Sequence, residues 1–323
     1  MNRILLAFLL FPAVALAQAP QAAWKPDRPV ELVIGAAAGG ANDRIGRAIQ
    51  RVLQDNKIVS VPVNVLNKPG GGQSIAFAYL NTHPSNPHYL GLASSSWLTT
   101  IAAKRGAGDH RDFTPIVKIL DEYQVYFVRT DSPIKTARDI IEQLKKDASS
   151  LSFGFSTAVG NPLHISIAAL ARHAGADPKK VKAVVFNSGT DTAVQVAGGH
   201  LDVGVQSPGS AYGLAEAGKV RIIAVGAPKR HPGALANVPT LREQGIDVDA
   251  NVFYTVFGPK GLTPAQTAYW EQALSQVMQG ADIRKNVEQN YWTIDLIGHR
   301  DLPQFLDREI ETYRRALTEL GLM

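Results

Sequence analysis

The stretch Val33-Ile34-Gly35-Ala36-Ala37-Ala38-Gly39-Gly40-Ala41-Asn42-Asp43 joins the end of an apolar strand to a loop of small residues and the start of a helix. Residues 30–34 are mostly β-branched, as strand residues are. From Ile45 to Leu53 apolar residues recur at helical spacing. Because the loop has hardly any side chains, a ligand can approach its backbone closely.

This loop is predicted to end at a helix N-terminus, with Asn42 or Asp43 as the candidate N-cap. The free N–H groups of the first turn and the helix dipole would make an anion site from backbone alone. An ordinary tight connection explains the stretch equally well when it is taken alone. A Walker loop is excluded because no Lys-Ser/Thr follows the glycines, and the G-x-G-x-x-G spacing of dinucleotide sites is absent.

The N-terminal residues are typical of a secretory signal peptide. Arg3 precedes a short apolar run, and Ala15-Leu16-Ala17 has the small-residue pattern of a cleavage site. The run is too short to span a bilayer. We therefore expect residues 1–17 to be removed and the mature chain to be exported as a freely diffusing protein. The chain has no cysteine, which excludes a lipid-anchored cysteine, disulfides, thiolate catalysis and Cys-ligated metals.

Composition suggests a two-domain globular protein with a small anionic ligand. Of the 323 residues, 45% are hydrophobic, and about 300 remain after cleavage, enough for two domains. The formal charge of +5 includes Arg3, so the mature chain carries 5 − 1 = +4. This excess is scattered and forms no basic stripe with interleaved aromatic residues, so we expect no nucleic-acid partner.

Two more strands, residues 61–66 and 89–93, also end in small or hydroxylic residues before a helix. The first runs into the glycine-rich loop 67–74, and the second ends at Ser94-Ser95-Ser96-Trp97. Three such units in a row are expected of a parallel sheet that binds a ligand at its carboxyl edge. Turn chemistry explains each loop singly, but their recurrence favours a shared site.

The opening pattern recurs in the middle of the chain. Strand 151–155 is followed by Ser156–His164, in which Asn161 suits the N-cap and Pro162 the first helical position. Residues 184–191 form another strand, polar loop and helix start. We expect the first loop and the Ser156–His164 loop to face each other across a cleft between two lobes.

Two strands are predicted to carry the chain between these lobes, residues 123–128 outward and residues 252–257 on the return. Lobe 1 then comprises residues 27–126 and 250–323, and lobe 2 comprises residues 127–249. Pro264 opens a long helix, and a last helix spans about residues 302–320.

Taken together, these stretches resemble the tripartite tricarboxylate transporter substrate-binding proteins, the Bug or TctC-like family of bacterial periplasmic receptors. The resemblance covers nearly all of the mature chain. It is carried by Gly39-Gly40 with Asp43, Asn67-Lys68-Pro69-Gly70-Gly71-Gly72, Gly160-x-x-x-His164, Gly198-Gly199-His200-Leu201-Asp202-Val203, Val238-Pro239-Thr240-Leu241-Arg242-Glu243-Gln244-Gly245 and Gly258-Pro259-Lys260-Gly261-Leu262-Thr263-Pro264. Each motif is weak alone, but their order and spacing are specific.

The resemblance implies an α/β, two-lobed periplasmic-binding-protein fold of the type II, Venus-flytrap kind, with a ligand cleft between the lobes. It further implies a receptor that captures a small organic carboxylate, whether a di- or tricarboxylate or an aromatic acid, and delivers it to membrane transporter subunits. The ligand-binding residues it implies are Ala38, Gly39, Gly40, Asn42, Asp43, Ser94, Ser95, Ser96, Ser156, Thr157, Val159, Gly160, Asn161, His164, Asn187, Ser188 and Gln206. Departures from the family pattern at Ala36 to Ala38, Asn42, Asn161 and Gln206 bear on the identity of the ligand.

Two other functions stay open at this point, a sensor that reports its ligand to a membrane kinase and a periplasmic enzyme acting on a carboxylate. Cues for an enzyme are poor, since neither H-E-x-x-H nor G-x-S-x-G occurs. His83, His88 and His110 are expected to be solvated loop residues. His164 is either functional or packed on its helix start, and Asp43 is better explained as a cap or loop brace than as a general base. We expect no catalytic residue, no metal, no cofactor and a monomer.

Overall fold

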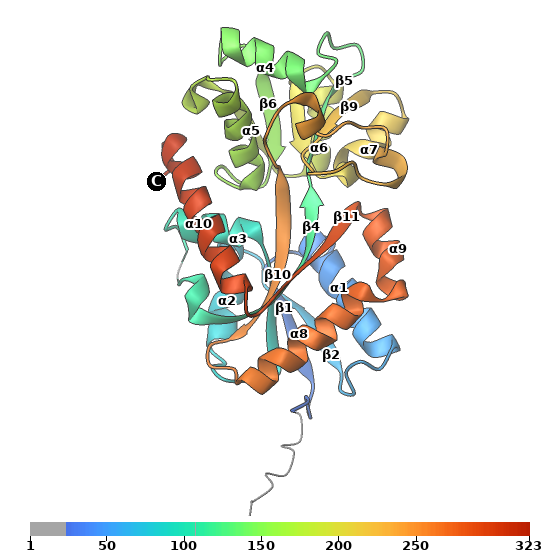
Figure 1. Cartoon of the computed structure of the whole chain (residues 1–323), viewed down its shortest axis with the longest axis vertical. Helices are drawn as coiled ribbons and strands as arrows, with labels where there is room; N and C mark the ends of the chain where they lie inside the picture. The colour runs from blue at the N-terminus through green and yellow to red at the C-terminus, as the bar shows by residue number, and fades with distance from the viewer. Residues whose placement is uncertain (1–23, 107) are drawn as a thin grey trace, which may run out of the picture.

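Two β-sheets, each with helices on both faces, make up the protein in the computed structural model, which describes residues 24–106 and 108–323. The predicted signal peptide, residues 1–17, lies outside the described residues. Figure 1 shows the sheets one above the other, with β4 running from the lower sheet toward the upper one and β10 returning in the opposite direction. The mixed α/β fold that the sequence predicts is thereby confirmed.

The first sheet has the strand order β11-β4-β10-β3-β1-β2. β1, β2 and β3 are parallel, so their carboxyl ends meet at one edge, as predicted, whereas β10 runs antiparallel to β3 and β4. The strands are β1 (Val30–Ile34), β2 (Val63–Asn67), β3 (Tyr89–Ser94), β4 (Phe113–Tyr123), β10 (Asn251–Pro259) and β11 (Trp292–Gly298).

The second sheet has the order β7-β6-β8-β5-β9, with β6 parallel to β7 and β8 and with β5 antiparallel to β8 and β9. Its strands are β5 (Val125–Arg129), β6 (Ser152–Ser156), β7 (Lys182–Phe186), β8 (Val203–Gln206) and β9 (Val220–Val225). Here again the parallel strands end at one edge, and each is followed by a helix.

Helices cover both faces of each sheet. In the first sheet α1, α8 and α9 lie on one face and α2, α3 and α10 on the other; in the second, α4 and α5 lie opposite α6 and α7. Their bounds are α1 (Ala41–Asp55), α2 (Ser74–Asn81), α3 (Ser95–Ala102), α4 (Ala137–Lys146), α5 (Pro162–His173), α6 (Gly189–Ala197), α7 (Pro208–Glu216), α8 (Pro264–Gln279), α9 (Ala281–Gln289) and α10 (Leu302–Glu319). No helix of the described residues is both long and apolar enough to cross a bilayer.

The chain passes between the sheets at Gln124 and Ala250. The Gln124 N–H donates to the Ala250 carbonyl at 2.8 Å, and Gly226 is hydrogen-bonded to both residues, at 2.9 and 3.0 Å. These bonds tie the two connecting segments together where they enter the second sheet. The predicted boundary at residue 126 falls within β5, and the division into two lobes is taken up below as a proposal.

Five of the strands and α-helices were not predicted from the sequence, namely β4, β8, β11, α7 and α9. The expectation of solvated histidines is wrong for two of the three. His88 is buried beside Asp27 and Arg28, and the His110 ring lies 2.7 Å from a carboxylate oxygen of Asp109 and 2.9 Å from one of Asp307. These histidines therefore hold loops in place.

The contact between the neighbouring strands β8 and β5 can be tested by a substitution in the second sheet. A Cβ on Gly204 of β8 would overlap the ring of Phe127 opposite it. Gly204→Ala should lower the free energy of unfolding by about 1–3 kcal/mol through overpacking, as measured by urea unfolding.

The matched control is Gly213→Ala in α7, where an added Cβ has no neighbour within 4 Å among the described residues. It should raise the free energy of unfolding by about 0.5–1 kcal/mol because alanine loses less backbone entropy in a helix. Equal unfolding midpoints for Gly204→Ala and wild type would contradict the packing of β8 on β5.

Candidate functional site

The loop after β1 is braced by a carboxylate that does not cap the helix. The N-cap of α1 is Gly40, not Asn42 or Asp43 as predicted, and Gly40 has no side chain with which to cap. Asp43, in the first turn, instead reaches back and accepts a hydrogen bond from the Gly39 N–H at 2.8 Å. Gly39 has φ +83°, a conformation that favours glycine.

Asp43 also links the loop to its neighbours. Its carboxylate accepts hydrogen bonds from Arg47 Nε at 2.9 and 3.0 Å and from Asn67 Nδ2 at 2.9 Å. Burial alone raises the pKa of Asp43, but the hydrogen bonds from Arg47, Gly39 and Asn67 outweigh it and the pKa is lowered. A buried, charged Asp43 is therefore fully occupied in holding the ends of β1 and β2 together.

A second network joins Asn42, Gln73 and Ser94. Asn42 Nδ2 donates to Gln73 Oε1 at 3.1 Å, the same oxygen accepts the Ser94 N–H at 3.1 Å, and Gln73 Nε2 donates to Ser94 Oγ at 2.6 Å. Gln73 has φ +78°, which is uncommon for a residue other than glycine. Gln73 was not among the binding residues predicted from the sequence, although it ends the glycine run of the second loop and connects all three loops at this edge of the first sheet.

These networks leave the first turns of α1 and α3 free to bind a ligand. Among the described residues, no hydrogen-bond acceptor faces the N–H groups of Ala41, Asn42 and Asp43 or those of Ser96 and Trp97, and neither helix has a side-chain cap. Both helices follow parallel strands at the same sheet edge. Orphan amides at two neighbouring helix starts form an anion site without any cationic side chain.

The loop after β6 has the opposite character, because the helix that follows it has a side-chain cap. Asn161 caps α5 as predicted, accepting the His164 N–H at 3.0 Å, while its Nδ2 donates to the Ser156 carbonyl at 2.8 Å and to Thr157 Oγ1 at 2.7 Å. Thr157 has φ +77°, a strained conformation for a β-branched residue. Strain of this kind persists only where the surroundings impose it, and it is concentrated at functional sites.

His164 closes this loop from the helix side. Its ring stacks on Phe155 with centroids 4.8 Å apart, and Nδ1 accepts the Gly160 N–H at 3.1 Å. Burial lowers the pKa of His164 to about 4, so the ring is neutral at pH 7. With Nδ1 acting as the acceptor, the ring proton sits on Nε2, which is then a donor.

The other predicted residues are divided between the two sheet edges. Ser156 donates to Gln206 Oε1 at 3.0 Å, Gln206 donates to Thr192 at 3.0 Å, and Ser188 caps α6. Ala38, Val159 and Asn187 are exposed. Within the described part of the chain, the side chains of Ser96 and Asn187 make no hydrogen bond and are free to donate.

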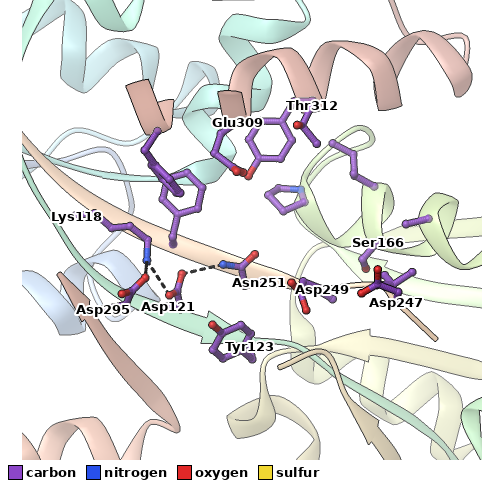
Figure 2. Close-up of a pocket in the computed structure, with 18 of the residues that line it drawn as sticks. Lys118, Asp121, Tyr123, Ser166, Asp247, Asp249, Asn251, Asp295, Glu309 and Thr312 are labelled. Carbon is purple, nitrogen blue, oxygen red and sulfur yellow. Dashed lines mark hydrogen bonds and ion pairs between the residues drawn. The ribbon is translucent and has the colours of Figure 1, made fainter. Parts of the chain in front are cut away.

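A separate cavity of about 390 Å³ lies beside β4 and β10, between α5 and α10 (Figure 2). Lys118 Nζ, almost fully buried, lies 2.7 Å from Asp121 and 2.5 Å from Asp295. The acidic lining residues are Asp121, Asp247, Asp249, Asp295 and Glu309, and the basic ones are Lys118 and Arg172.

None of the predicted ligand-binding residues lines this cavity. Burial raises the pKa of both Asp121 and Glu309. An acidic lining repels a carboxylate, whereas the free amides of α1 and α3 attract one. The loops, not this cavity, are therefore the candidate site for an anion. Across residues 24–106 and 108–323, no group of three or more His, Asp or Glu side chains is placed to hold a metal.

Comparison with known proteins identifies the fold as that of periplasmic solute-binding proteins. A TctC solute-binding protein from Polaromonas matches with a TM-score of 0.76 at 22% identity, over 91% of this chain and 99% of that one. MatC from Rhodopseudomonas palustris with bound malate matches with a TM-score of 0.71, and an R. palustris protein with adipate with 0.75, each at 20% identity. The matches cover 90% and 92% of this chain and 99% and 98% of those chains.

The model of the tripartite tricarboxylate transporter family receptor matches residues 47–322, and the chain belongs to that family. A UPF0065 protein encoded in the gbd 5′ region of Cupriavidus necator is 28% identical over 96% of this chain and 94% of its own length. The family predicted from the sequence is thereby confirmed.

The lowered pKa of His164 predicts a pH dependence of stability. Between about pH 6.5, the ordinary histidine value, and the folded value of about 4, the unfolded chain binds a proton that the folded chain does not. The free energy of unfolding should therefore fall as pH drops through this window and be unaffected by His164 above it.

Urea unfolding at pH 7 and pH 4.5 measures this dependence in wild type and in His164→Asn. Asparagine keeps an acceptor for the Gly160 N–H but does not titrate, so the drop at low pH should be smaller in the variant. His173→Asn, at the exposed end of α5, is the matched control. An equal drop in wild type and His164→Asn would show that His164 is not held neutral.

Proposed function

We propose that the protein is a receptor that binds a small organic carboxylate at the carboxyl edges of its two sheets and delivers it to a tripartite tricarboxylate-type membrane transporter. The observation that carries the proposal is the pair of uncapped helix starts, α1 and α3, at one sheet edge. Arg44 lies beside them, with its guanidinium donating to the Gly39 carbonyl at 3.0 Å, and adds positive potential. One carboxylate of the ligand is expected to bind these amides.

The energetics support backbone recognition. Micromolar binding requires about 8 kcal/mol, and each hydrogen bond to a charged group contributes about 1.5–3 kcal/mol. About four to six bonds therefore suffice after ordering costs, and the two helix starts with the Ser96 hydroxyl offer that many donors. On the second lobe, Asn187 and His164 Nε2 are the proposed partners of the ligand's other end.

A dicarboxylate is the ligand class we favour. Two structural neighbours hold malate and adipate, which are both dicarboxylates. Free donors on two sheet edges suit a ligand with an anionic group at each end. Export to the periplasm through the predicted signal peptide is part of the same proposal, as is a transient contact with the transporter subunits.

We further propose that residues 27–126 with 250–323 and residues 127–249 move as two lobes that close on the ligand. Support comes from Gln124 and Ala250, the two points at which the backbone passes between the sheets. Small-angle scattering should show a smaller radius of gyration at saturating ligand, as hinge closure requires. An unchanged radius at saturation would contradict closure.

The direct test of function is a thermal-shift screen of mono-, di- and tricarboxylates and aromatic acids, beginning with malate and adipate. Hits should be confirmed by calorimetry, and the ligand should be recovered unchanged after incubation. Catalytic conversion of the ligand would overturn the receptor proposal in favour of an enzyme, and the absence of any carboxylate hit would overturn the ligand class.

Filling the vacant cap of α1 tests the binding mode. Gly40 has φ −69° and ψ 170°, which a side chain tolerates, and an added Cβ would lie 3.2 Å from the Ala37 carbonyl oxygen. Gly40→Asp places a carboxylate where the ligand's is expected. It should weaken dicarboxylate binding by about 1–3 kcal/mol while leaving stability equal or slightly higher.

Gly40→Ala is the matched control because it adds the same Cβ without an acceptor. It should retain most of the affinity measured by calorimetry. Full affinity in Gly40→Asp, or equal losses in both variants, would show that the first turn of α1 does not hold the ligand.

A further inference from the structure

The C-terminus of α10 ends in a cap that reaches the second lobe. The Leu322 N–H donates to the Leu317 carbonyl at 2.8 Å, the Gly321 N–H donates to the Thr318 carbonyl at 3.0 Å, and Gly321 has φ +70°. This is a Schellman motif, in which the residue after the glycine folds back on the last helical turn. We refer to residues 317–322 as the C-terminal cap.

The C-terminal cap lies directly beneath the loop after β6. A Cβ added to Gly160 would lie 2.9 Å from Leu317 Cδ2 and 3.4 Å from Leu322 Cδ1. Gly160 also has φ +85°, so its backbone conformation and its surroundings both require glycine. The Schellman motif brings the two leucines together, and they form an apolar surface against which the loop backbone packs.

Polar contacts also join the C-terminal cap to its neighbours. Arg105, just after α3, donates to the Leu322 carbonyl at 3.2 Å and to the Val159 carbonyl at 3.4 Å. Arg172 of α5 pairs with Glu319 of α10 at 2.8 Å. Figure 1 shows α10 running beside α3 and ending near α5. Because both ion-pair side chains are about half exposed, the pair adds little, and the leucine packing carries the contact.

We propose that the C-terminal cap positions the Ser156–Asn161 loop for ligand binding, with Leu322 and Arg105 as positioning residues that do not touch the ligand. The proposal rests on the receptor function, because the loop is a binding loop only if the protein binds a ligand there. Thr157 holds a strained conformation, and such a conformation needs support from its surroundings. The C-terminal cap supplies that support from the opposite lobe.

Hydrogen exchange of Leu322→Asp tests this without any ligand. The loop amides of Thr157, Gly160 and Asn161, which donate to Phe186, His164 and Ala158, should exchange about ten-fold faster. The Thr192 amide, bonded to Ser188 in the same lobe, should be unchanged. Met323→Asp is the matched control, since Met323 is exposed and one residue away.

Affinity for malate and adipate should fall about ten-fold in Leu322→Asp, the order of the cost of fixing one residue on binding. Leu322→Met should restore it. Arg105→Ala should also lower the affinity, and Arg105→Lys should lower it less. The losses of binding free energy in Arg105→Ala and Leu322→Asp should not add up in the double variant, because both substitutions act on one loop. If Leu322→Asp melts below the assay temperature, Leu322→Ala replaces it.

Unchanged loop exchange in Leu322→Asp, or equal acceleration in Met323→Asp, would overturn the positioning role. Faster exchange without loss of affinity would overturn the link to binding. If wild type binds neither malate nor adipate, the dicarboxylate proposal fails by itself, and the exchange data still decide whether the C-terminal cap holds the loop.

Discussion

The geometry of the candidate site depends on which groups the Asp43 carboxylate binds. In a helix that begins after a strand, an acidic residue in the first turn ordinarily neutralises the helix start. Here it is turned back onto Gly39 and paired with Arg47 and Asn67. The loop is thereby fixed, while the first-turn amides of α1 have no partner among the described residues. Rigidity and unsatisfied donors, which usually exclude each other, are present together, as an anion receptor requires.

The two sheet edges differ in whether the helices that begin there are capped by side chains. In the first lobe the helix starts are open and the side chains brace one another, whereas in the second lobe Asn161 and Ser188 cap their helices. The second lobe contributes a strained loop, a neutral histidine and an exposed Asn187. In the mechanism we propose, this asymmetry would let the first lobe capture the ligand and the second lobe complete the contacts on closure.

Local patterns in the sequence predicted much of this structure. β1 and the Asn161-Pro162 start of α5 follow from periodicity and capping rules that act over a few residues. β4 and β11 were missed because Lys118 and Asp121 look exposed until Lys118 pairs with Asp295, far along the chain. The same holds for His110 with Asp307, for Gln73 with Ser94 and for Arg105 with Leu322, whose partners only the fold brings near.

Nuclear magnetic resonance titration with the tightest-binding carboxylate tests the central claim most directly. The amide protons of Ala41, Asn42 and Asp43 and those of Ser96 and Trp97 should move downfield together as they acquire a charged acceptor. The capped amides of His164 and Asp191 should move little, because they are already bonded. Shifts confined to residues of the acidic cavity, such as Asn251 and Thr312, with the first turns of α1 and α3 unmoved, would contradict the account.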